Sequence, residues 1–373
     1  MVDLTQHPVK AVYGLGALGF ELVRFPIILI KFLVLGRQHP SWTLRQAITV
    51  HAFFSGLWHV SKVQVATPLP LTPEQEKERF VVIKPAKSDA YKGPLRSNKD
   101  IVPVEIGATW FPAPLTTGSD KNTKVVLHIH GGAFVTGDGR TAASGPMAKK
   151  LLKHTPATHV FCPQYRLSTL PVSKTSNPFP AALQDSLTSY LYLLNDLNIS
   201  PKNIILSGDS AGGNLAIALL RYITDYGSEL GLPAPSSALL WSPWTNPADT
   251  SGSYVHDNRN YATDYISPPF TAWGTTAYAG EGGDKVLSQP YVSQKNRTFK
   301  TGVPMFVNTG SGEVLYFDIV EWAEKMKEAG NDLQLDIEEN VPHDILLLGH
   351  LLGFNQEAVN MAKRAGEWLR GRV

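Results

Sequence analysis

The sequence predicts an α/β fold in which helices cover both faces of a central, largely parallel sheet. Short, continuously apolar runs alternate with amphipathic stretches of helical length over most of the chain. Continuous apolar strands indicate a sheet that is buried on both faces, which is the usual environment of parallel strands. The chain has 373 residues, of which 43% are hydrophobic and 18% charged, so it can bury a sizeable core and is typical of a globular protein.

Most of the apolar runs of strand length are followed by a stretch with helical periodicity. The predicted strands are residues 125–130, 157–162, 203–206, 238–241, 303–308 and 333–337. The predicted helices are residues 142–154, 181–194, 211–226, 317–329 and 356–369. We therefore expect repeated strand–helix units.

Two departures from this alternation predict the domain organisation. Residues 69–97 are rich in Pro, Lys, Glu, Asp and Ser, which indicates a surface connection. Residues 245–284 are rich in Asn, Asp, Tyr, Gly and Pro, which indicates an insertion over one end of the sheet. We expect an N-terminal helical segment over residues 1–75 and an α/β core over residues 76–373, with a cap or lid insertion at about 245–284.

Charge and cysteine content exclude several classes of protein. Thirty-four Lys and Arg against 32 Asp and Glu give a formal charge of +2, so no nucleic-acid partner is expected. Cys162 is the only cysteine, which excludes an internal disulfide framework and every zinc site with several cysteines. A lone cysteine fits a reducing compartment, and we expect a cytoplasmic protein, with membrane association as an open alternative.

Residues 12–35 are the one stretch that raises the question of a membrane. They are mostly apolar, but Glu21, Arg24 and Lys31 interrupt them. Charged side chains are costly at membrane depth, although Glu21 and Arg24 lie three residues apart and can pair on a helix. We favour a helix that packs on the protein's own pocket, and attachment at the membrane interface and a membrane span are the alternatives.

The candidate nucleophile is Ser210, in the sequence Gly208-Asp209-Ser210-Ala211-Gly212. This Gly-x-Ser-x-Gly pattern follows a predicted strand and opens a predicted helix. A tight turn between strand and helix lifts the serine hydroxyl clear of the sheet, and the two glycines leave room for that turn. The start of the helix also points its backbone N–H groups at the reacting oxygen.

Glycines that follow the strand at 125–130 predict an oxyanion hole. Backbone N–H groups of Gly131 and Gly132 can approach a developing oxyanion closely, together with the N–H of Ala211. His128 and His130 alternate onto one strand face, but no further histidine follows closely, so we expect no metal site and interpret His130 as a residue that orders the loop.

The candidate base is His343, in the loop after the predicted strand at 333–337. In hydrolases with this turn, the chain order is nucleophile, acid and histidine. A loop at the carboxyl end of a strand is where the base should lie. His350, in an expected helix, and His256, in the insertion, are the alternatives.

The candidate acid is Glu313, in the turn after the predicted strand at 303–308. Asp318 is the alternative, but it falls inside the next predicted helix, where a surface or capping role is more common. We therefore expect Ser210, Glu313 and His343 to form a catalytic triad.

The motifs of this chain resemble those of the hormone-sensitive-lipase family of α/β-hydrolases, the carboxylesterase/lipase group, from about Arg79 to the end. They are His130-Gly131-Gly132-Ala133-Phe134, Tyr165-Arg166-Leu167, Phe179-Pro180-Ala181-Ala182, Gln184-Asp185, Gly208-Asp209-Ser210-Ala211-Gly212-Gly213-Asn214, Ser242-Pro243-Trp244, Glu313-Val314-Leu315 and His343. The family usually has aspartate at the position of Glu313 and often a third glycine at that of Ala133. The resemblance implies ester hydrolysis, an N-terminal helical cap, and supporting roles for Asp185 and Asp209.

The expected function is that of a serine carboxylic-ester hydrolase acting through an acyl-enzyme on small to medium apolar esters. One alternative is an acyl-transfer, product-release or cyclising hydrolase of secondary metabolism with the same triad. Another is a non-catalytic ligand-binding relative, because plant gibberellin receptors resemble this family but lack the catalytic histidine. We expect no cofactor and no metal, and a small-molecule ester as the partner. Peripheral membrane contact through residues 12–35 and a homodimer stay open.

Overall fold

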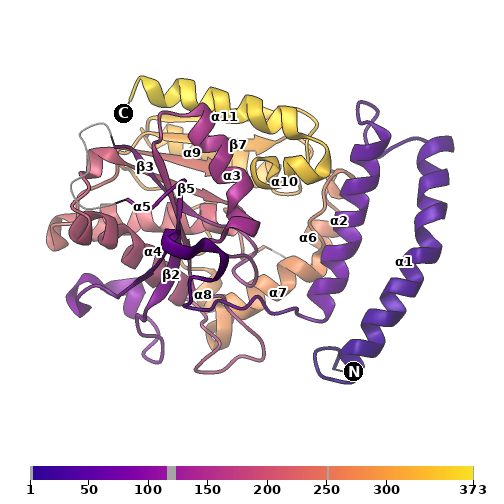
Figure 1. Ribbon diagram of the computed structural model, residues 1–373, viewed down its shortest axis with the longest axis horizontal. Helices are drawn as coiled ribbons and strands as arrows, with labels where there is room; N and C mark the ends of the chain where they lie inside the picture. The colour runs from indigo at the N-terminus through magenta and orange to yellow at the C-terminus, as the bar shows by residue number, and fades with distance from the viewer. Residues whose placement is uncertain (1–2, 116–122, 250–251, 373) are drawn as a thin grey trace.

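An eight-stranded sheet forms the centre of the molecule (Figure 1). The computed structural model describes residues 3–115, 123–249 and 252–372. The strands are β1 (Phe80–Ile83), β2 (Ile106–Phe111), β3 (Val125–Ile129), β4 (His159–Gln164), β5 (Ile204–Asp209), β6 (Ser237–Trp241), β7 (Met305–Gly310) and β8 (Leu333–Glu338). Their order across the sheet is β1-β2-β4-β3-β5-β6-β7-β8.

The predicted class, an α/β fold with a mostly parallel sheet, is confirmed. Strands β4, β3, β5, β6, β7 and β8 are mutually parallel, and β1 and β2 add an antiparallel edge. All six predicted strands are present, but β1 and β2 were not predicted. β1 has only four residues and lies within 69–97, where the polar composition indicates a surface connection.

Helices flank the sheet on both faces. The α-helices of the described residues are α1 (Val9–Val34), α2 (Leu44–Lys62), α3 (Thr141–His154), α4 (Ala181–Leu191), α5 (Ser210–Leu230), α6 (Gly252–His256), α7 (Pro268–Ala279), α8 (Gly283–Leu287), α9 (Tyr316–Glu328), α10 (Ile345–Leu352) and α11 (Asn355–Arg370). Apolar residues of α4, α5 and α9 form one core with the sheet, and those of α3, α10 and α11 form a second core on the opposite face.

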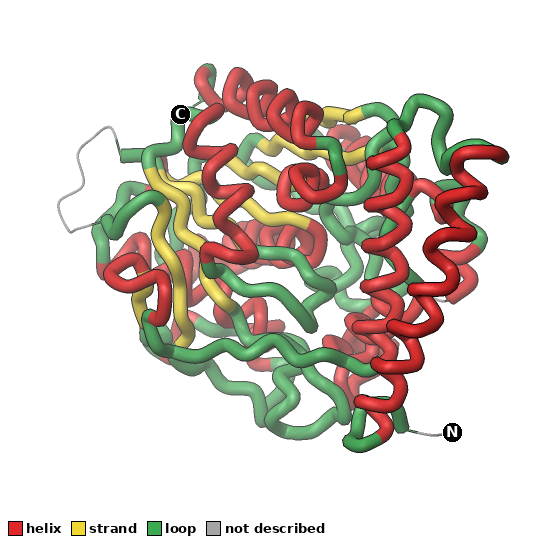
Figure 2. The backbone as a smooth tube through the Cα atoms, turned by 45° about the vertical axis from the view of Figure 1, so that its right-hand side comes forward, coloured by secondary structure: helices red, strands yellow, loops and turns green. Residues whose placement is uncertain are grey.

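Helices α1 and α2 form an antiparallel pair at one side of the molecule (Figures 1 and 2). A capping box at Thr43 starts α2, because the Thr43 hydroxyl accepts the Gln46 N–H while the Gln46 side chain accepts the Thr43 N–H. α2 lies between α1 and the rest of the chain, where it contacts α7 and α10. The segment after β6 contributes α6 and α7 to the same side of the molecule, and α8 follows them.

The close approach of α5 to strand β3 depends on glycine. A Cβ atom at Gly212 would lie 1.9 Å from the carbonyl oxygen of Ile129, which is backbone and cannot move aside cheaply. A Cβ at Gly208 would lie 2.3 Å from the carbonyl oxygen of Gly212. Any side chain at these positions would therefore push α5 away from the sheet.

Replacing Gly212 with alanine should lower the free energy of unfolding by about 1–3 kcal/mol, the usual cost of forcing extra volume into a packed region. Gly14→Ala is the matched control, because Gly14 lies in the second turn of α1 and a Cβ there meets nothing within 4 Å. Alanine there should keep or raise stability, by up to about 1 kcal/mol, through its helix propensity. Urea unfolding of both variants measures the difference, and equal midpoints would contradict the tight contact.

Candidate active site

Ser210 stands at the sharp turn between β5 and α5. β5 ends at Asp209 and α5 begins at Ser210, whose backbone φ of +49° lies in the left-handed region that serine rarely adopts. Strain of this kind persists where the surrounding structure enforces it, and it is common at functional sites. The Ser210 side chain is partly exposed, so the turn presents its hydroxyl at the carboxyl end of the sheet.

His343 and Glu313 form a buried pair beside this turn. The Nδ1 atom of His343 lies 2.6 Å from Oε2 of Glu313, and both side chains are buried. The other carboxylate oxygen of Glu313 accepts the Gly310 N–H at 2.6 Å, the Ser242 hydroxyl at 3.0 Å and the Thr309 hydroxyl. These bonds hold the carboxylate in one orientation. With the Nδ1 proton donated to Glu313, Nε2 is the ring nitrogen left to accept a proton.

The competing candidates lie elsewhere. Asp318 forms an ion pair of 2.6 Å with Lys295, and no hydrogen bond of the described residues joins it to His343. His350 is in α10, where its Nδ1 bonds the carbonyl oxygen of Leu347 at 3.0 Å. His256 is exposed at the end of α6. The structure thus pairs His343 with Glu313 and places none of the alternatives in that pair.

Ser210 and His343 line the same cavity, whose volume is about 560 Å³. Among the described residues, no hydrogen bond joins the Ser210 hydroxyl to the His343 ring. Such bonds are often long in unliganded enzymes and tighten when substrate binds. The remaining lining is largely apolar and includes Ala52, Phe53, Leu57 and Val60 of α2, Phe270 of α7, and Leu347 and Leu348 of α10.

One of the predicted oxyanion-hole donors in the glycine loop after β3, the N–H of Gly131, already has a hydrogen-bond partner. The Gly131 N–H donates a hydrogen bond of 2.9 Å to Oδ2 of Asp209, so it does not face the cavity as a free donor. Gly132 lines the cavity with a φ of +104°, and a Cβ there would lie 2.1 Å from the Thr136 carbonyl oxygen. Within the described part of the chain, no hydrogen bond uses the N–H of Gly132, Ala133 or Ala211.

Asp209 ties the glycine loop to the base loop. Its Oδ1 lies 2.9 Å from Nε2 of His128, and its carboxylate shares a hydrogen bond with the side chain of Asp344. Burial and the neighbouring Asp209 raise the pKa of Asp344 well above its usual value. Burial acts against ionisation of Asp209, but the hydrogen bond and charge of His128 outweigh it and lower the pKa of Asp209. One carboxyl of the pair is therefore protonated and donates to the other.

Asp264, between β6 and α7, is a site residue that the sequence did not reveal. Its Oδ1 accepts the N–H of His343 at 3.2 Å, and its Oδ2 accepts the N–H of Val314 at 2.7 Å. One carboxyl thus fixes the backbones of both the base loop and the acid turn. Burial raises the pKa of Asp264 to about 6. No sequence motif marks this aspartate, because its partners are backbone groups of distant loops.

The environment of His343 favours its charged form. Burial alone would lower the pKa of the ring, but the hydrogen bond to Glu313 and the negative charges of Glu313, Asp264 and Asp209 outweigh it, so the pKa of His343 is raised. A raised pKa stabilises the imidazolium that forms when the histidine takes a proton.

The residues described hold no group of three or more His, Cys, Asp and Glu side chains with the geometry of a metal site. His128 bonds Ser207 and Asp209, and His130 stacks on Tyr165 with ring centroids 4.2 Å apart. Both histidines thus have structural partners.

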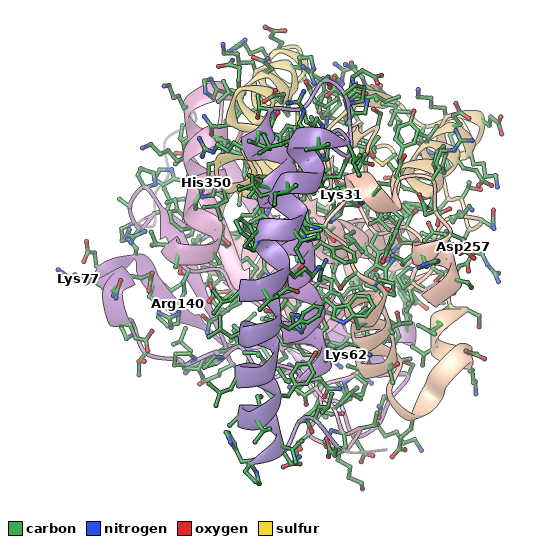
Figure 3. All side chains as sticks on the ribbon, turned by 90° about the vertical axis from the view of Figure 1, so that its right-hand side faces the viewer. Lys31, Lys62, Lys77, Arg140, Asp257 and His350 are labelled. Carbon is green, nitrogen blue, oxygen red and sulfur yellow. The ribbon has the colours of Figure 1, made fainter. Side chains whose placement is uncertain are left out.

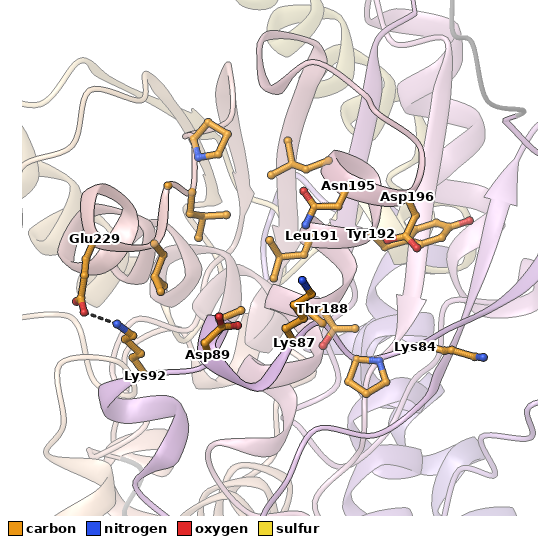
Figure 4. Close-up of a pocket in the computed structure, with 18 residues that line it drawn as sticks. Lys84, Lys87, Asp89, Lys92, Thr188, Leu191, Tyr192, Asn195, Asp196 and Glu229 are labelled. Atoms are coloured by element: carbon orange, nitrogen blue, oxygen red, sulfur yellow. Dashed lines mark hydrogen bonds and ion pairs between the residues drawn. The ribbon is translucent and has the colours of Figure 1, made fainter.

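A second cavity, of about 740 Å³, lies beside α4 and the end of α5 (Figure 4). Its lining mixes lysines with carboxylates, among them the ion pair of Lys92 with Glu229. None of the described residues that line it belongs to the predicted site. The apolar cavity at Ser210 is therefore the candidate active site.

The fold, the serine turn and the buried histidine–glutamate pair define a hydrolase-like enzyme. Residues 126–347, more than half of the chain, match the family described as alpha/beta hydrolase fold. The chain belongs to this family.

Curated relatives agree with this assignment. Esterase LipU of Mycobacterium tuberculosis is 27% identical over 256 residues, which cover 68% of this chain and 79% of the relative. An acetyl-hydrolase of Streptomyces hygroscopicus is 26% identical over 224 residues, which cover 57% of this chain and 65% of the relative. These similarities confirm the expected enzyme class, a hydrolase of the carboxylesterase/lipase type.

Solved structures show the same fold. An esterase/lipase from an uncultured bacterium superposes with a TM-score of 0.60 at 24% identity, covering 94% of this chain and 98% of that one. A hormone-sensitive lipase from a metagenome library gives a TM-score of 0.57 at 25% identity, covering 72% of this chain and 82% of that one. The resemblance to the hormone-sensitive-lipase family is thereby confirmed.

Replacing Glu313 with glutamine should lower kcat by at least about a thousandfold, because the amide can no longer hold the histidine in the tautomer that accepts a proton. Asp318→Asn should keep kcat within a few-fold of wild type, since its ion pair with Lys295 lies outside the site. Steady-state hydrolysis of an activated ester measures both variants. A larger loss at Asp318 would assign the acid to that residue.

Replacing Asp264 with asparagine should shift the acid limb of the kcat/KM profile to lower pH. The histidine acts as a base only when neutral, so activity rises as pH passes its pKa, and removing a nearby negative charge lowers that pKa. Asp257→Asn is the control in the same insertion, because Asp257 is exposed. An acid limb that moves equally in both variants, or in neither, would contradict this role of Asp264.

Proposed function

We propose that the protein is a serine carboxylesterase that works through an acyl-enzyme formed on Ser210. The observation that carries the proposal is the buried hydrogen bond between Glu313 and His343 at the wall of the cavity that Ser210 also lines. A fixed histidine beside a strained, accessible serine is the arrangement that activates a hydroxyl for attack.

In the first half of the reaction, the Ser210 oxygen attacks the ester carbonyl and its proton passes to Nε2 of His343. Glu313 stabilises the imidazolium. The carbonyl oxygen becomes an oxyanion, and we assign its donors as the N–H groups of Gly132, Ala133 and Ala211. The engagement of the Gly131 N–H with Asp209 supports this assignment. Ala211 also lies in the first turn of α5, where the helix dipole favours negative charge.

The intermediate then collapses, and His343 gives its proton to the leaving alcohol oxygen as the ester bond breaks. In the second half, His343 takes a proton from water, and the resulting hydroxide attacks the acyl carbon. The imidazolium returns that proton to Ser210 Oγ as the acid leaves. Every proton and bond is accounted for without a metal or an organic cofactor.

The lining of the cavity favours small to medium apolar esters. Leu57, Val60, Phe270 and Leu348 contribute side chains that offer no hydrogen bonds to a substrate. A volume of about 560 Å³ holds a short acyl chain with a modest alcohol. α2 and α7 supply much of this lining, and we propose that residues 1–75 and the insertion at about 245–284 together act as the cap.

Ser210→Ala should lower kcat by at least about a thousandfold and leave the fold intact, because the change removes one oxygen from the surface of the turn. A fluorophosphonate should add one adduct to the wild type and none to Ser210→Ala, as measured by intact mass. The matched control is Ser144→Ala, since Ser144 lines the same cavity but donates its hydroxyl to the Asp138 carbonyl. Retained turnover in folded Ser210→Ala, or an adduct lost only in Ser144→Ala, would overturn the proposal.

A further inference from the structure

Helix α1 exposes an unusually apolar surface. Twelve of the 21 exposed large hydrophobic side chains among the described residues belong to residues 12–35. They are Val12, Leu15, Leu18, Phe20, Leu22, Val23, Phe25, Ile27, Ile30, Leu33, Val34 and Leu35, and most are more than half exposed. Contiguous exposed apolar surface of this kind marks an interaction site.

The polar side chains of α1 point the other way, toward α2. Arg24 bonds Glu21 at 2.9 Å and His51 of α2 at 3.0 Å. Glu21 bonds His59 of α2 at 3.2 Å, and the Tyr13 hydroxyl lies 2.9 Å from the other nitrogen of that ring. α1 is therefore amphipathic in the inverse sense, with its polar side against the protein and its apolar side outward.

The sequence favours a helix over residues 12–35 that packs on the pocket, and α1 lies in a different place. α2 lines the catalytic cavity, and no described residue of α1 does so. Of the three charged side chains that interrupt residues 12–35, Glu21 and Arg24 form hydrogen bonds between α1 and α2. Only Lys31 is exposed. None of the helices in the described part of the chain combines the length and the apolar content that a membrane span requires.

The charge of this region is positive. Residues 3–62 carry six Lys and Arg against two Asp and Glu, a net charge of +4, whereas the whole chain carries +2. Lys31 and Lys62 lie on the side of the molecule that α1 covers (Figure 3). We propose that the outer face of α1 docks onto a negatively charged lipid surface, with the helix lying in the interface.

The charge pattern also argues against a second copy as the occupant. A two-fold dimer through this face would bring the same patch of both copies together. The net charge of +4 on residues 3–62, which include Lys10, Lys31 and Lys62, would then lie close to the equal charge of the second copy. Anionic headgroups match these lysines, and their long side chains can reach the headgroups while the apolar face inserts.

The test is sedimentation of the full chain with vesicles of two parts phosphatidylcholine to one part phosphatidylserine. The wild type should bind, and binding should weaken with salt and on pure phosphatidylcholine. The triple variant Leu15→Gln, Leu22→Gln, Ile30→Gln should bind at least roughly tenfold more weakly, because three apolar side chains no longer enter the lipid. The matched control is Leu71→Gln, Val102→Gln, Val104→Gln, at exposed positions outside α1, and should bind as wild type does.

Two further measurements make each outcome decisive. Ester hydrolysis in lipid-free buffer checks that both triple variants are folded. Loss of hydrolysis in Ser210→Ala tests the proposed function and not the docking proposal.

Because Cys162 is buried, a polarity-sensitive dye can be placed on Leu22→Cys or on Val102→Cys, and only the first should report an apolar environment on vesicles. The docking proposal would be overturned if the wild type stayed in the supernatant or if both triple variants bound vesicles equally. It would also be overturned if the wild type bound no vesicles and formed a dimer that the α1 substitutions dissociate.

Discussion

The hydrogen bond between Glu313 and His343 is the interaction on which the rest of the site depends. It joins the turn after β7 to the loop after β8, and burial of both side chains makes their orientation costly to change. The neighbouring polar groups hold the two loops that carry this hydrogen bond. Asp264 holds both backbones, and Ser242 bridges the two loops through its hydroxyl, which donates to Glu313 and accepts the Asp344 N–H at 3.2 Å.

The sheet brings these loops to the nucleophile. β5, β6, β7 and β8 are adjacent and parallel, so the segments that follow them meet at one edge. The Asp209 carboxyl then links the serine turn to the glycine loop and, through Asp344, to the base loop. The cavity is therefore bounded by segments whose positions are fixed relative to one another.

Much of this could be predicted from the sequence, because parallel strands and the serine turn leave local signals. The six parallel strands were predicted within a few residues, and Ser210, Glu313 and His343 were singled out by position after particular strands. Three features could not be predicted: the role of Asp264, the hydrogen bond of the Gly131 N–H to Asp209, and the short strand β1. Each depends on contacts between segments far apart in the chain. The same holds for α1, because the sequence does not show that Arg24 and Glu21 bind His51 and His59 of α2.

The most direct test of the account is a proton NMR spectrum of the resting enzyme. A proton held between His343 Nδ1 and a buried carboxylate should give a resonance far downfield of the amide region, because charge-assisted hydrogen bonds are short and strongly polarised. We predict this resonance in the wild type and its loss in the glutamine variant of Glu313. A spectrum without it throughout the pH range in which the enzyme is folded, or one unchanged by that substitution, would contradict the central role of this bond.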